Sequence, residues 1–523
     1  MPTWTGNGAN ELWSTVGNWD TAVPTAATTA VFNNTGGNSN KNVTITLGAT
    51  CLSLTCTGYT GQMNFANGLT VATNVTLGAG MTTSGSQAIT KTGTGTLTSN
   101  GVILSSGIIT PSAAGTTQTF GDNWIMNSGF GVNLAAVNIV GGGFTASIGG
   151  ELNLLGGVTC ITTPILFKLT GTGQLTGTYI SSTATCSIEI SSSGLISFFT
   201  PTFNGVNFTY TTGSVSISSL FIGAGATRFN NVSPISFGSI TFGASAGQIL
   251  TLNSNTYVSG ALTAGAGSGT INGSTIYVGG NVVTSAVGFL GTSTIEMSGS
   301  SNASLTSSAA TGIIQNNLTI NKSAGATVKL PTAQTITWGT TGRILTYTAG
   351  IIDVSTSTFT IPINTNITMS GMPFYNLTLP GLASHLINLP ISASNNLTLA
   401  ATGNTTFSGS GGWLCANLLC STAGRIITLA NSSSGASYRT TTNAQLTATS
   451  ASPITITSDN ATTRSLWTLD NGANQSLTYV SGTRIDSSQG QTIYTFGSSG
   501  SLTSTVNWAT GSRPGTVSYT FVN

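Results

Sequence analysis

Apolar and polar residues alternate over short stretches that are separated by glycine, serine and asparagine. In residues 43–47, for example, Val, Ile and Leu occupy every second position and Thr lies between them. A two-residue alternation predicts strands with one buried face and one exposed face. No stretch shows the 3.6-residue period of an amphipathic helix, so the pattern predicts an all-β chain.

The predicted strands recur at about twenty residues. Tyr257-Val258 returns as Tyr277-Val278, and Ser274-Thr275-Ile276 returns nineteen residues later as Ser293-Thr294-Ile295. Such a period in a background rich in Thr, Ser, Gly and Asn predicts stacked coils. We therefore expect a single elongated right-handed parallel β-helix, a β-solenoid, with N- and C-terminal caps. An array of β-sandwiches is the alternative, and it would show a regular spacing of about 80–100 residues, which the sequence lacks.

One phrase, Asn-apolar-Thr-apolar, marks several of these strands. It starts at Asn317, Asn366, Asn376 and Asn396. Its alternation places the apolar residues inside and Thr outside. The leading Asn either forms a ladder with its neighbours in adjacent coils or takes the left-handed conformation at a corner.

Formal charge is scarce. The 523 residues include 12 Lys and Arg and 10 Asp and Glu, so that charged residues make up 4% and the net charge is +2. Ordinary soluble domains carry about 25%. Nucleic-acid recognition needs clustered Lys and Arg, whereas Lys91, Lys168 and Arg228 lie far apart, so we expect no nucleic-acid partner.

The amino terminus shows no basic segment followed by an apolar one, and no stretch of about 18 apolar residues follows. We therefore expect no signal peptide and no membrane insertion. Virion proteins, which are made and assembled in the cytoplasm, fit this pattern.

Tryptophan gathers near both ends of the chain. The open end of a solenoid needs a cap, and a large aromatic ring is an effective lid because it covers about 150–250 Å². A sugar-stacking platform is the alternative for the three N-terminal residues. The candidate capping and assembly residues are Trp4, Trp13, Trp19, Trp467 and Trp508. The expected organisation is an N-terminal cap at 1–36, a rod at 37–450 and a C-terminal capping and assembly region at 451–523.

The terminal segments also resemble known proteins. The pattern W-x-G, W and G-N-W-D with a following Pro, at residues 4–32, resembles the opening of β-helical repeat proteins among phage structural proteins and autotransporter-type adhesins. The run from Leu477 to Trp508 resembles their terminal coils, although Gln489-Gly490 replaces a double glycine. The resemblance implies a β-helix and a structural or adhesive role, and we expect Arg484 and Asp486 to form a structural ion pair.

The six cysteines form an even set that permits disulfides. Five-residue spacing places two members of a C-x4-C pair on opposite faces of a straight strand, so a bridge within either pair needs a turn. We expect buried thiols that fill the coil interior, with disulfides as the alternative; a zinc site is disfavoured because no His lies near. The residues are Cys51, Cys56, Cys160, Cys186, Cys415 and Cys420.

Catalytic patterns are weak. Glycoside hydrolysis needs two facing carboxylates, and among the ten acids Asp470 and Asp486 come nearest to the coil spacing. His385 is the single histidine, and no nucleophile elbow surrounds it. We expect no enzymatic activity, no cofactor and no metal.

The leading hypothesis is therefore a non-enzymatic structural virion protein, a phage capsid decoration, fibre or spike that acts as a display or attachment rod. Its expected partners are other virion proteins and itself, as a homotrimer, and a host-surface glycan is a further candidate. A secreted bacterial surface adhesin that binds glycans is the alternative, and a carbohydrate-degrading tailspike is the third.

Overall fold

The structure of the chain is a computed structural model. It describes residues 1–104, 107–111, 115–126, 130–133, 137–150, 152–182, 184–217, 219–232, 235–244, 247–267, 269–330, 332–339, 343–361, 366–367, 372–380, 385–387, 390–400, 403–497 and 502–511.

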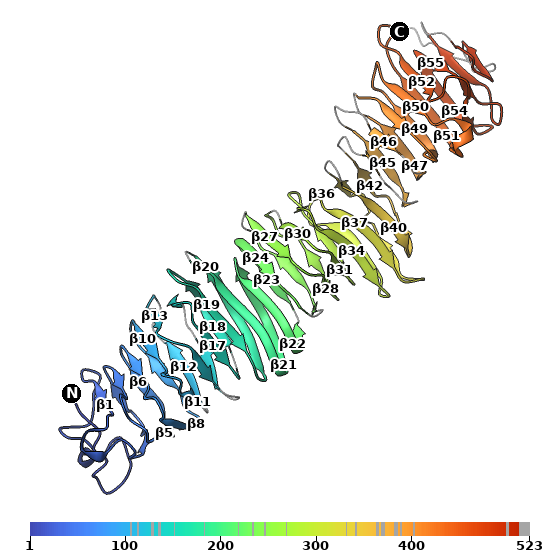
Figure 1. Cartoon of the computed structure of the whole chain (residues 1–523). Helices are drawn as coiled ribbons and strands as arrows, with labels where there is room; N and C mark the ends of the chain where they lie inside the picture. The colour runs from blue at the N-terminus through green and yellow to red at the C-terminus, as the bar shows by residue number, and fades with distance from the viewer. Residues whose placement is uncertain are drawn as a thin grey trace. The chain divides into compact units, whose positions relative to one another are not determined.

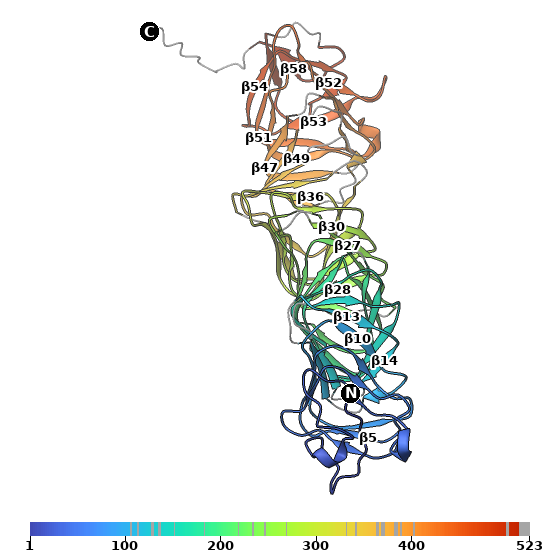
Figure 2. The ribbon, with the colours of Figure 1, turned by 90° about the vertical axis from the view of Figure 1, so that its left-hand side faces the viewer.

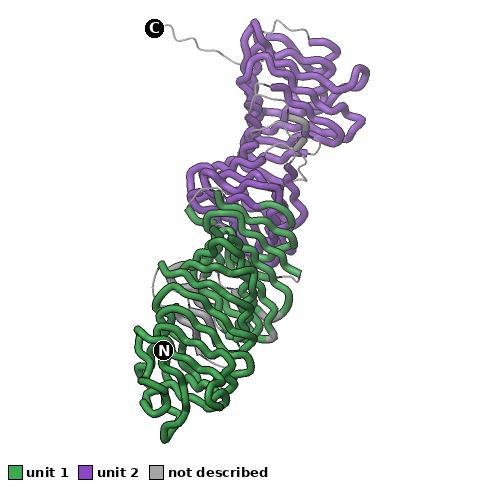
Figure 3. Tube along the Cα trace, turned by 60° about the vertical axis from the view of Figure 1, so that its left-hand side comes forward, with its two compact units in different colours: residues 1–260, 272–274 green, residues 261–271, 275–523 purple. Residues whose placement is uncertain are grey.

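Short parallel strands make up most of the described chain (Figure 1). The helical segments within it are three-residue 3-10 turns, η1 (Val16–Asn18), η2 (Thr35–Gly37) and η3 (Ser432–Ser434). Two compact units divide the chain: unit 1 holds Met1–Gly260 and Asn272–Ser274, and unit 2 holds Ala261–Ile271 and Thr275–Asn523 (Figure 3). The proposed borders at residues 36 and 450 stay a prediction.

Unit 1 shows the twenty-residue period directly. Thr50 pairs with Thr70, Thr70 with Thr90, and Thr90 with Thr110, so each coil repeats the backbone position of the one before. The four strands involved are β3 (Thr50–Cys51), β6 (Leu69–Val71), β9 (Ile89–Lys91) and β12 (Gly107–Pro111).

Close stacking in unit 1 requires glycine at a corner. Gly85 has φ of +87°, and a Cβ atom there would lie 2.4 Å from the carbonyl oxygen of Phe65 in the preceding coil. Only glycine adopts this conformation without strain and without that clash. The many glycines of the sequence thus allow the coils to approach.

The aromatic stretch of unit 1 lies inside the coils. Phe208 contacts Phe198 and Phe229 with ring centroids 5.9 and 5.5 Å apart, and Phe229 stacks on Phe237 at 5.2 Å. All four rings are buried. Aromatic rings in contact with one another therefore fill the interior of these coils.

Unit 2 follows the same rule with less regular coil lengths. Ile276 in β31 (Ile276–Val278) pairs with Ile295 in β34 (Thr294–Gly299), as the nineteen-residue repeat predicts. A longer ladder of parallel strands runs through the rest of this unit, and β47, β49, β51 and β54 lie side by side in Figures 1 and 2. Its strands are β36 (Thr311–Ile314), β39 (Thr335–Trp338), β42 (Thr358–Thr360), β45 (Asn376–Leu379), β47 (Ile391–Leu399), β49 (Trp413–Cys420), β51 (Tyr438–Thr447) and β54 (Asn474–Thr478).

The core of each unit is the column of apolar side chains inside the coils. Leu318, Leu377 and Leu397, which follow the leading Asn of the repeated phrase, are all 0% exposed. The Thr that follows each Leu is partly exposed. The prediction of an all-β chain of stacked parallel coils is confirmed in both units.

Candidate functional site

The N-terminal tryptophans form a buried cluster on the first coil of unit 1. Trp19 contacts Trp4 and Trp13 with ring centroids 5.2 and 4.9 Å apart, and its indole N–H donates to the carbonyl of Trp13 at 2.8 Å. Phe32 stacks on Trp4 at 5.6 Å. Since the three indoles are at most 5% exposed, they present no open face for a sugar ring. The sugar-stacking alternative therefore has no support in this geometry.

The same segment covers the outer edges of the first strands. Thr3 pairs with Val31 of β1 (Ala30–Val31), and Leu12 pairs with Thr44 of β2 (Val43–Thr44). Exposed edges of this kind invite pairing with other chains, and a covering segment blocks them. These contacts are those that the capping hypothesis requires, although the role itself stays a prediction.

Near the other end of the chain, Trp467 is buried and Trp508 is half-buried, with their ring centroids 5.8 Å apart. The indole N–H of Trp467 donates to Thr440 at 3.3 Å, and that of Trp508 donates to Ser487 at 3.0 Å. Trp413, which the sequence did not single out, also donates to Thr440, at 3.2 Å. Tyr438 is the register partner of both Trp413 and Trp467, so the stacking of three successive coils aligns these rings.

The expected ion pair between Arg484 and Asp486 is not among the ion pairs of the described residues. Asp486 instead accepts the backbone N–H of Ser488 at 2.8 Å, and Arg439 forms a two-pronged pair with Asp470 at 2.9 and 2.8 Å. Arg439 and Asp470 are 31 residues apart in sequence, but they lie on adjacent coils, so their side chains meet. Arg484 and Asp486 are two residues apart on the same turn, and this local position does not pair them.

Most of the acidic side chains are held by local hydrogen bonds or ion pairs. Asp470, one of the two acids nearest to coil spacing, has both oxygens on Arg439. Glu151 and the side chain of His385 lie outside the described residues. The acids that accept from a neighbouring group are Asp20, Asp122, Glu189, Glu296, Asp353, Asp459, Asp470 and Asp486.

All six cysteines are buried free thiols, as expected. Burial raises the pKa of Cys51 and of Cys415 to about 12. Thiols with such values are protonated at neutral pH and behave as small apolar groups. Groups of three or more His, Cys, Asp or Glu side chains suited to a metal ion do not occur among the described residues.

Unit 2 carries on its outer surface two columns of side chains, two residues apart on each strand, over seven successive coils. We call these columns the polar face. Every member is partly or fully exposed, and none is charged. The first column is Thr335, Thr358, Asn376, Asn396, Asn417, Asn443 and Asn474; the second is Thr337, Thr360, Thr378, Thr398, Leu419, Gln445 and Ser476.

Asparagine side chains fix the middle of the first column. The amide of Asn417 donates to the side-chain oxygens of Asn395 and Asn396, at 3.0 and 2.9 Å, and Asn395 donates to Asn376 at 3.0 Å. Of the two roles that the sequence left open for the leading Asn, the structure shows the ladder at Asn376 and Asn396. Asn395 and Asn417 extend it, although neither begins a copy of the repeated phrase.

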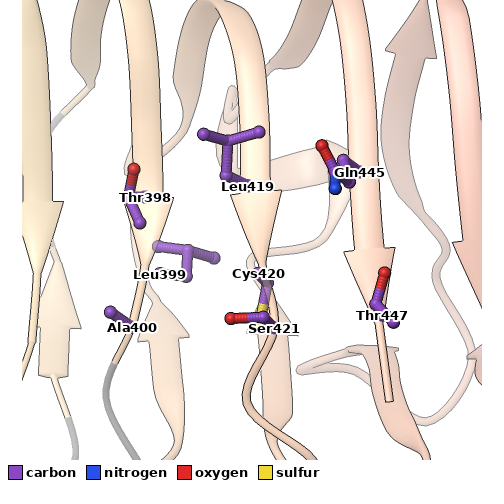
Figure 4. A pocket seen from close by; sticks show the side chains of 8 residues that line it. All are labelled: Thr398, Leu399, Ala400, Leu419, Cys420, Ser421, Gln445 and Thr447. Carbon is purple, nitrogen blue, oxygen red and sulfur yellow. The ribbon is translucent and has the colours of Figure 1, made fainter.

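Beside the second column lies an open hollow of about 250 Å³ (Figure 4). Thr398, Leu419 and Gln445 lie in one row across neighbouring strands, and Ala400 also lines the hollow. Burial raises the pKa of Cys420, which also lines the hollow, so this thiol stays neutral. The hollow offers hydroxyl and amide groups around a small apolar centre.

A second hollow of unit 2, of about 350 Å³, lies over β35 (Ala303–Ser307), β38 (Thr327–Lys329) and β41 (Ile351–Asp353). Lys329 is the register partner of both Ser304 and Asp353, so the three side chains form a row. This hollow differs from the first by carrying one positive and one negative charge.

Helices long and apolar enough to cross a membrane are absent from the described residues. Comparison of the chain with protein-family models, with curated proteins and with solved structures gives no match.

Proposed function

We propose that this chain is a non-enzymatic structural component of a virus particle, a phage decoration, fibre or spike protein, which displays the polar face for attachment. One observation carries the proposal: a column-ordered, uncharged surface covers seven coils of a β-solenoid unit. The proposal gains support from the acids, since those that are described mostly hold loops and neighbouring coils together. β-Solenoids of this construction are compatible with fibre, spike or adhesin roles.

The test is a fractionation of a culture that produces the protein. Virus particles and cell envelopes are separated on a density gradient, and antibodies raised against the purified chain are used for immunogold labelling and blotting. Gold on particles and peptides of this chain in the particle fraction support the proposal. Recovery of the chain in the envelope fraction alone would overturn it.

A glycan-binding surface adhesin is the second candidate, and the hollow beside Thr398 and Gln445 favours it. Hydroxyl and amide groups can bind sugar hydroxyls, while Leu419 can contact an apolar sugar face. The test is binding to a panel of bacterial surface polysaccharides by the wild-type chain and by Gln445→Arg, with Thr98→Arg in unit 1 as the matched control. Loss of binding in Gln445→Arg alone supports this role; equal binding by all three contradicts it.

We also propose that the chain forms a homotrimer. Few charges oppose the close approach of its surfaces, and the hydroxyl-rich outer faces suit packing between copies. Sedimentation equilibrium is expected to give three times the chain mass of 52.6 kDa. A mass equal to that of one chain across the concentration range would contradict the trimer.

A further inference from the structure

Two asparagine side chains in the wall of the second hollow of unit 2 are fixed by the neighbouring coil. Asn281 and Asn302 both line this hollow. The side-chain oxygen of Asn281 accepts the backbone N–H of Ser304 at 2.8 Å, and that of Asn302 accepts the backbone N–H of Thr327 at 2.9 Å. Because these bonds occupy the oxygens, each amide keeps its two N–H donors, for which the described residues supply no acceptor.

Hydroxyl groups and one apolar side chain lie beside these amides. Ser304 and Thr327 are half-buried and line the same hollow, and neither hydroxyl is hydrogen-bonded within the described part of the chain. Ile351 is the register partner of Thr327 on the next coil and is 52% exposed. Hydroxyl groups and an apolar surface therefore lie next to each other, as in many sites that bind small polar molecules.

Lys329 adds a positive charge to this wall. It is exposed and is the register partner of Asp353, yet the ion pairs of the described ranges do not include these two side chains. One oxygen of Asp353 instead accepts the backbone N–H and the hydroxyl of Ser355, at 3.1 and 3.0 Å. The ammonium group of Lys329 is therefore available to a ligand, and so is the other oxygen of Asp353.

A further hollow, of about 290 Å³, adjoins the second one, and the two share Ser304 and Lys329 in their walls. Gln334 lines the further hollow and is held at both ends, because its amide accepts from the backbone N–H of Ser307 at 3.2 Å and donates to the carbonyl of Ser307 at 3.1 Å. Small-molecule sites have volumes of about 300–1,000 Å³. Hollows near the lower end of this range suit one or two sugar residues.

We propose that the second hollow binds an oxyanion of an acidic glycan, either the carboxylate of a sugar acid or a phosphate ester. The donors point to this class. The ammonium of Lys329 and the amides of Asn281 and Asn302 are all N–H donors, and a hydrogen bond between a charged donor and an anionic oxygen is about twice as strong as a neutral one. The nearby hydroxyls and the second oxygen of Asp353 suit sugar hydroxyls, and Ile351 suits an apolar face of the ring.

The two described hollows of unit 2 thus differ in the ligand they suit. The hollow beside Thr398 and Gln445 carries no charged side chain, whereas the second hollow carries Lys329. The new site would contribute to the attachment role proposed above, but its test is separate. Binding is measured on the purified chain, and immunogold labelling of particles tests where the chain is located.

The experiment is a calorimetric titration of the full chain with three soluble oligomers. The first is an oligogalacturonate, which carries carboxylates; the second is a phosphorylated mannose oligomer; the third is a neutral mannose oligomer. One or both acidic oligomers should bind more tightly than the neutral one, and the one that binds identifies the oxyanion. Added sodium chloride should weaken this binding. Acidic oligomers that bind no better than the neutral one would overturn the proposal.

Variants of the cation locate the site. Lys329→Gln removes the charge and should lower the affinity for the acidic oligomer by about tenfold or more, whereas Lys329→Arg should retain most of it. Arg228→Gln is the matched control, because it removes an exposed positive charge from unit 1 and should leave the affinity unchanged. Equal losses in Lys329→Gln and Arg228→Gln would overturn the proposal, since net charge alone would then attract the ligand.

Two further variants change the charge of the hollow and keep its hydrogen bonds. Asp353→Asn retains an oxygen for Ser355 but removes the negative charge beside Lys329, so acidic oligomers should bind several-fold more tightly. Asn302→Asp retains the oxygen that accepts from Thr327 but replaces the N–H donors by a charged oxygen, so binding should weaken. Melting temperatures close to that of wild type verify folding, and unchanged affinity in both variants would contradict the assignment of the ligand to this hollow.

Discussion

At the scale of single residues, the direction of each side chain decides its contribution to stability. Leu397 is 0% exposed, and the next residue, Thr398, points outward on the polar face. Leu397→Ala should lower the free energy of unfolding of unit 2 by about 2–5 kcal/mol, because it removes buried apolar atoms and leaves a cavity. The measurement is chemical denaturation, with Thr398→Ala as the control, for which a change of about 0.5 kcal/mol or less is expected. Similar losses for both variants would contradict the inward and outward assignment.

Lys91 is a basic residue buried among the mostly apolar side chains of the interior. It is 0% exposed, it pairs in register with Val71, and burial lowers the pKa of its ammonium group from 10.5 to about 8. Below pH 8 the folded unit therefore holds a charge that the unfolded chain solvates better. Between pH 8 and 10.5, Lys91 loses its proton in the folded unit but keeps it in the unfolded chain. The free-energy cost of burying the charged ammonium group therefore becomes smaller as pH rises.

The corresponding prediction concerns Lys91→Met. The variant should be more stable than wild type by about 1–3 kcal/mol at pH 7, and the gain should shrink steadily toward pH 9.5. Because burial also raises the pKa of Cys51 to about 12, thiol ionisation in the unfolded chain opposes this trend in both proteins. The quantity to measure is thus the difference between the two unfolding curves at each pH. A difference that does not change with pH would contradict a lowered pKa at Lys91.

At the scale of elements, the asparagine ladder makes the polar face a structural feature as well as a surface. Asn417→Ala removes two hydrogen bonds and should destabilise unit 2 by about 1–2 kcal/mol. Asn417→Asp should cost more, because a carboxylate then faces the oxygens of Asn395 and Asn396. The measurement is thermal and chemical unfolding. Asn474→Ala, at the exposed end of the same column, is the control with an expected change of about 0.5 kcal/mol or less; equal losses at both positions would show that the ladder contributes nothing.

Alternation along the chain was sufficient to predict the strands and their buried faces, because the two-residue period is a local property. Leu318, Leu377 and Leu397 could be assigned to the interior in this way. Coil length is not local. The first column of the polar face advances from Asn376 to Asn396 by 20 residues but from Asn443 to Asn474 by 31, since the corners differ in length. Which side chains align across coils could therefore not be read from the sequence.

The variable length of the coils also explains which contacts could not be predicted from the sequence and which were predicted wrongly. Arg439 and Asp470 are 31 residues apart, so their spacing does not match the twenty-residue repeat. Arg484 and Asp486 were close in sequence and were expected to pair, yet residues two apart at a turn do not share a coil-to-coil contact. In a solenoid, proximity follows the stacking of coils more than distance along the chain.

At the scale of the whole molecule, stability depends on packing and hydrogen bonding because so few groups are charged. Charged residues make up 4% of the chain, and the ion pairs found among the described residues, Lys168 with Glu189 and Arg439 with Asp470, are partly exposed. Exposed ion pairs contribute about 0–1 kcal/mol each and are screened by salt, whereas burial of Leu, Ile and Val is not weakened by it.

The melting temperature should therefore change by no more than about 2 °C between 0.05 and 0.5 M sodium chloride. Differential scanning calorimetry at the two salt concentrations measures this, and chloride avoids the general stabilisation that sulfate produces. Arg439→Ala is the matched variant: it removes the two-pronged pair and should lower the melting temperature only slightly, with the loss smaller at high salt. A fall of many degrees with added chloride would mean that electrostatic attraction holds the coils together, which contradicts a fold stabilised by apolar columns inside the coils and by hydroxyl and amide ladders outside them.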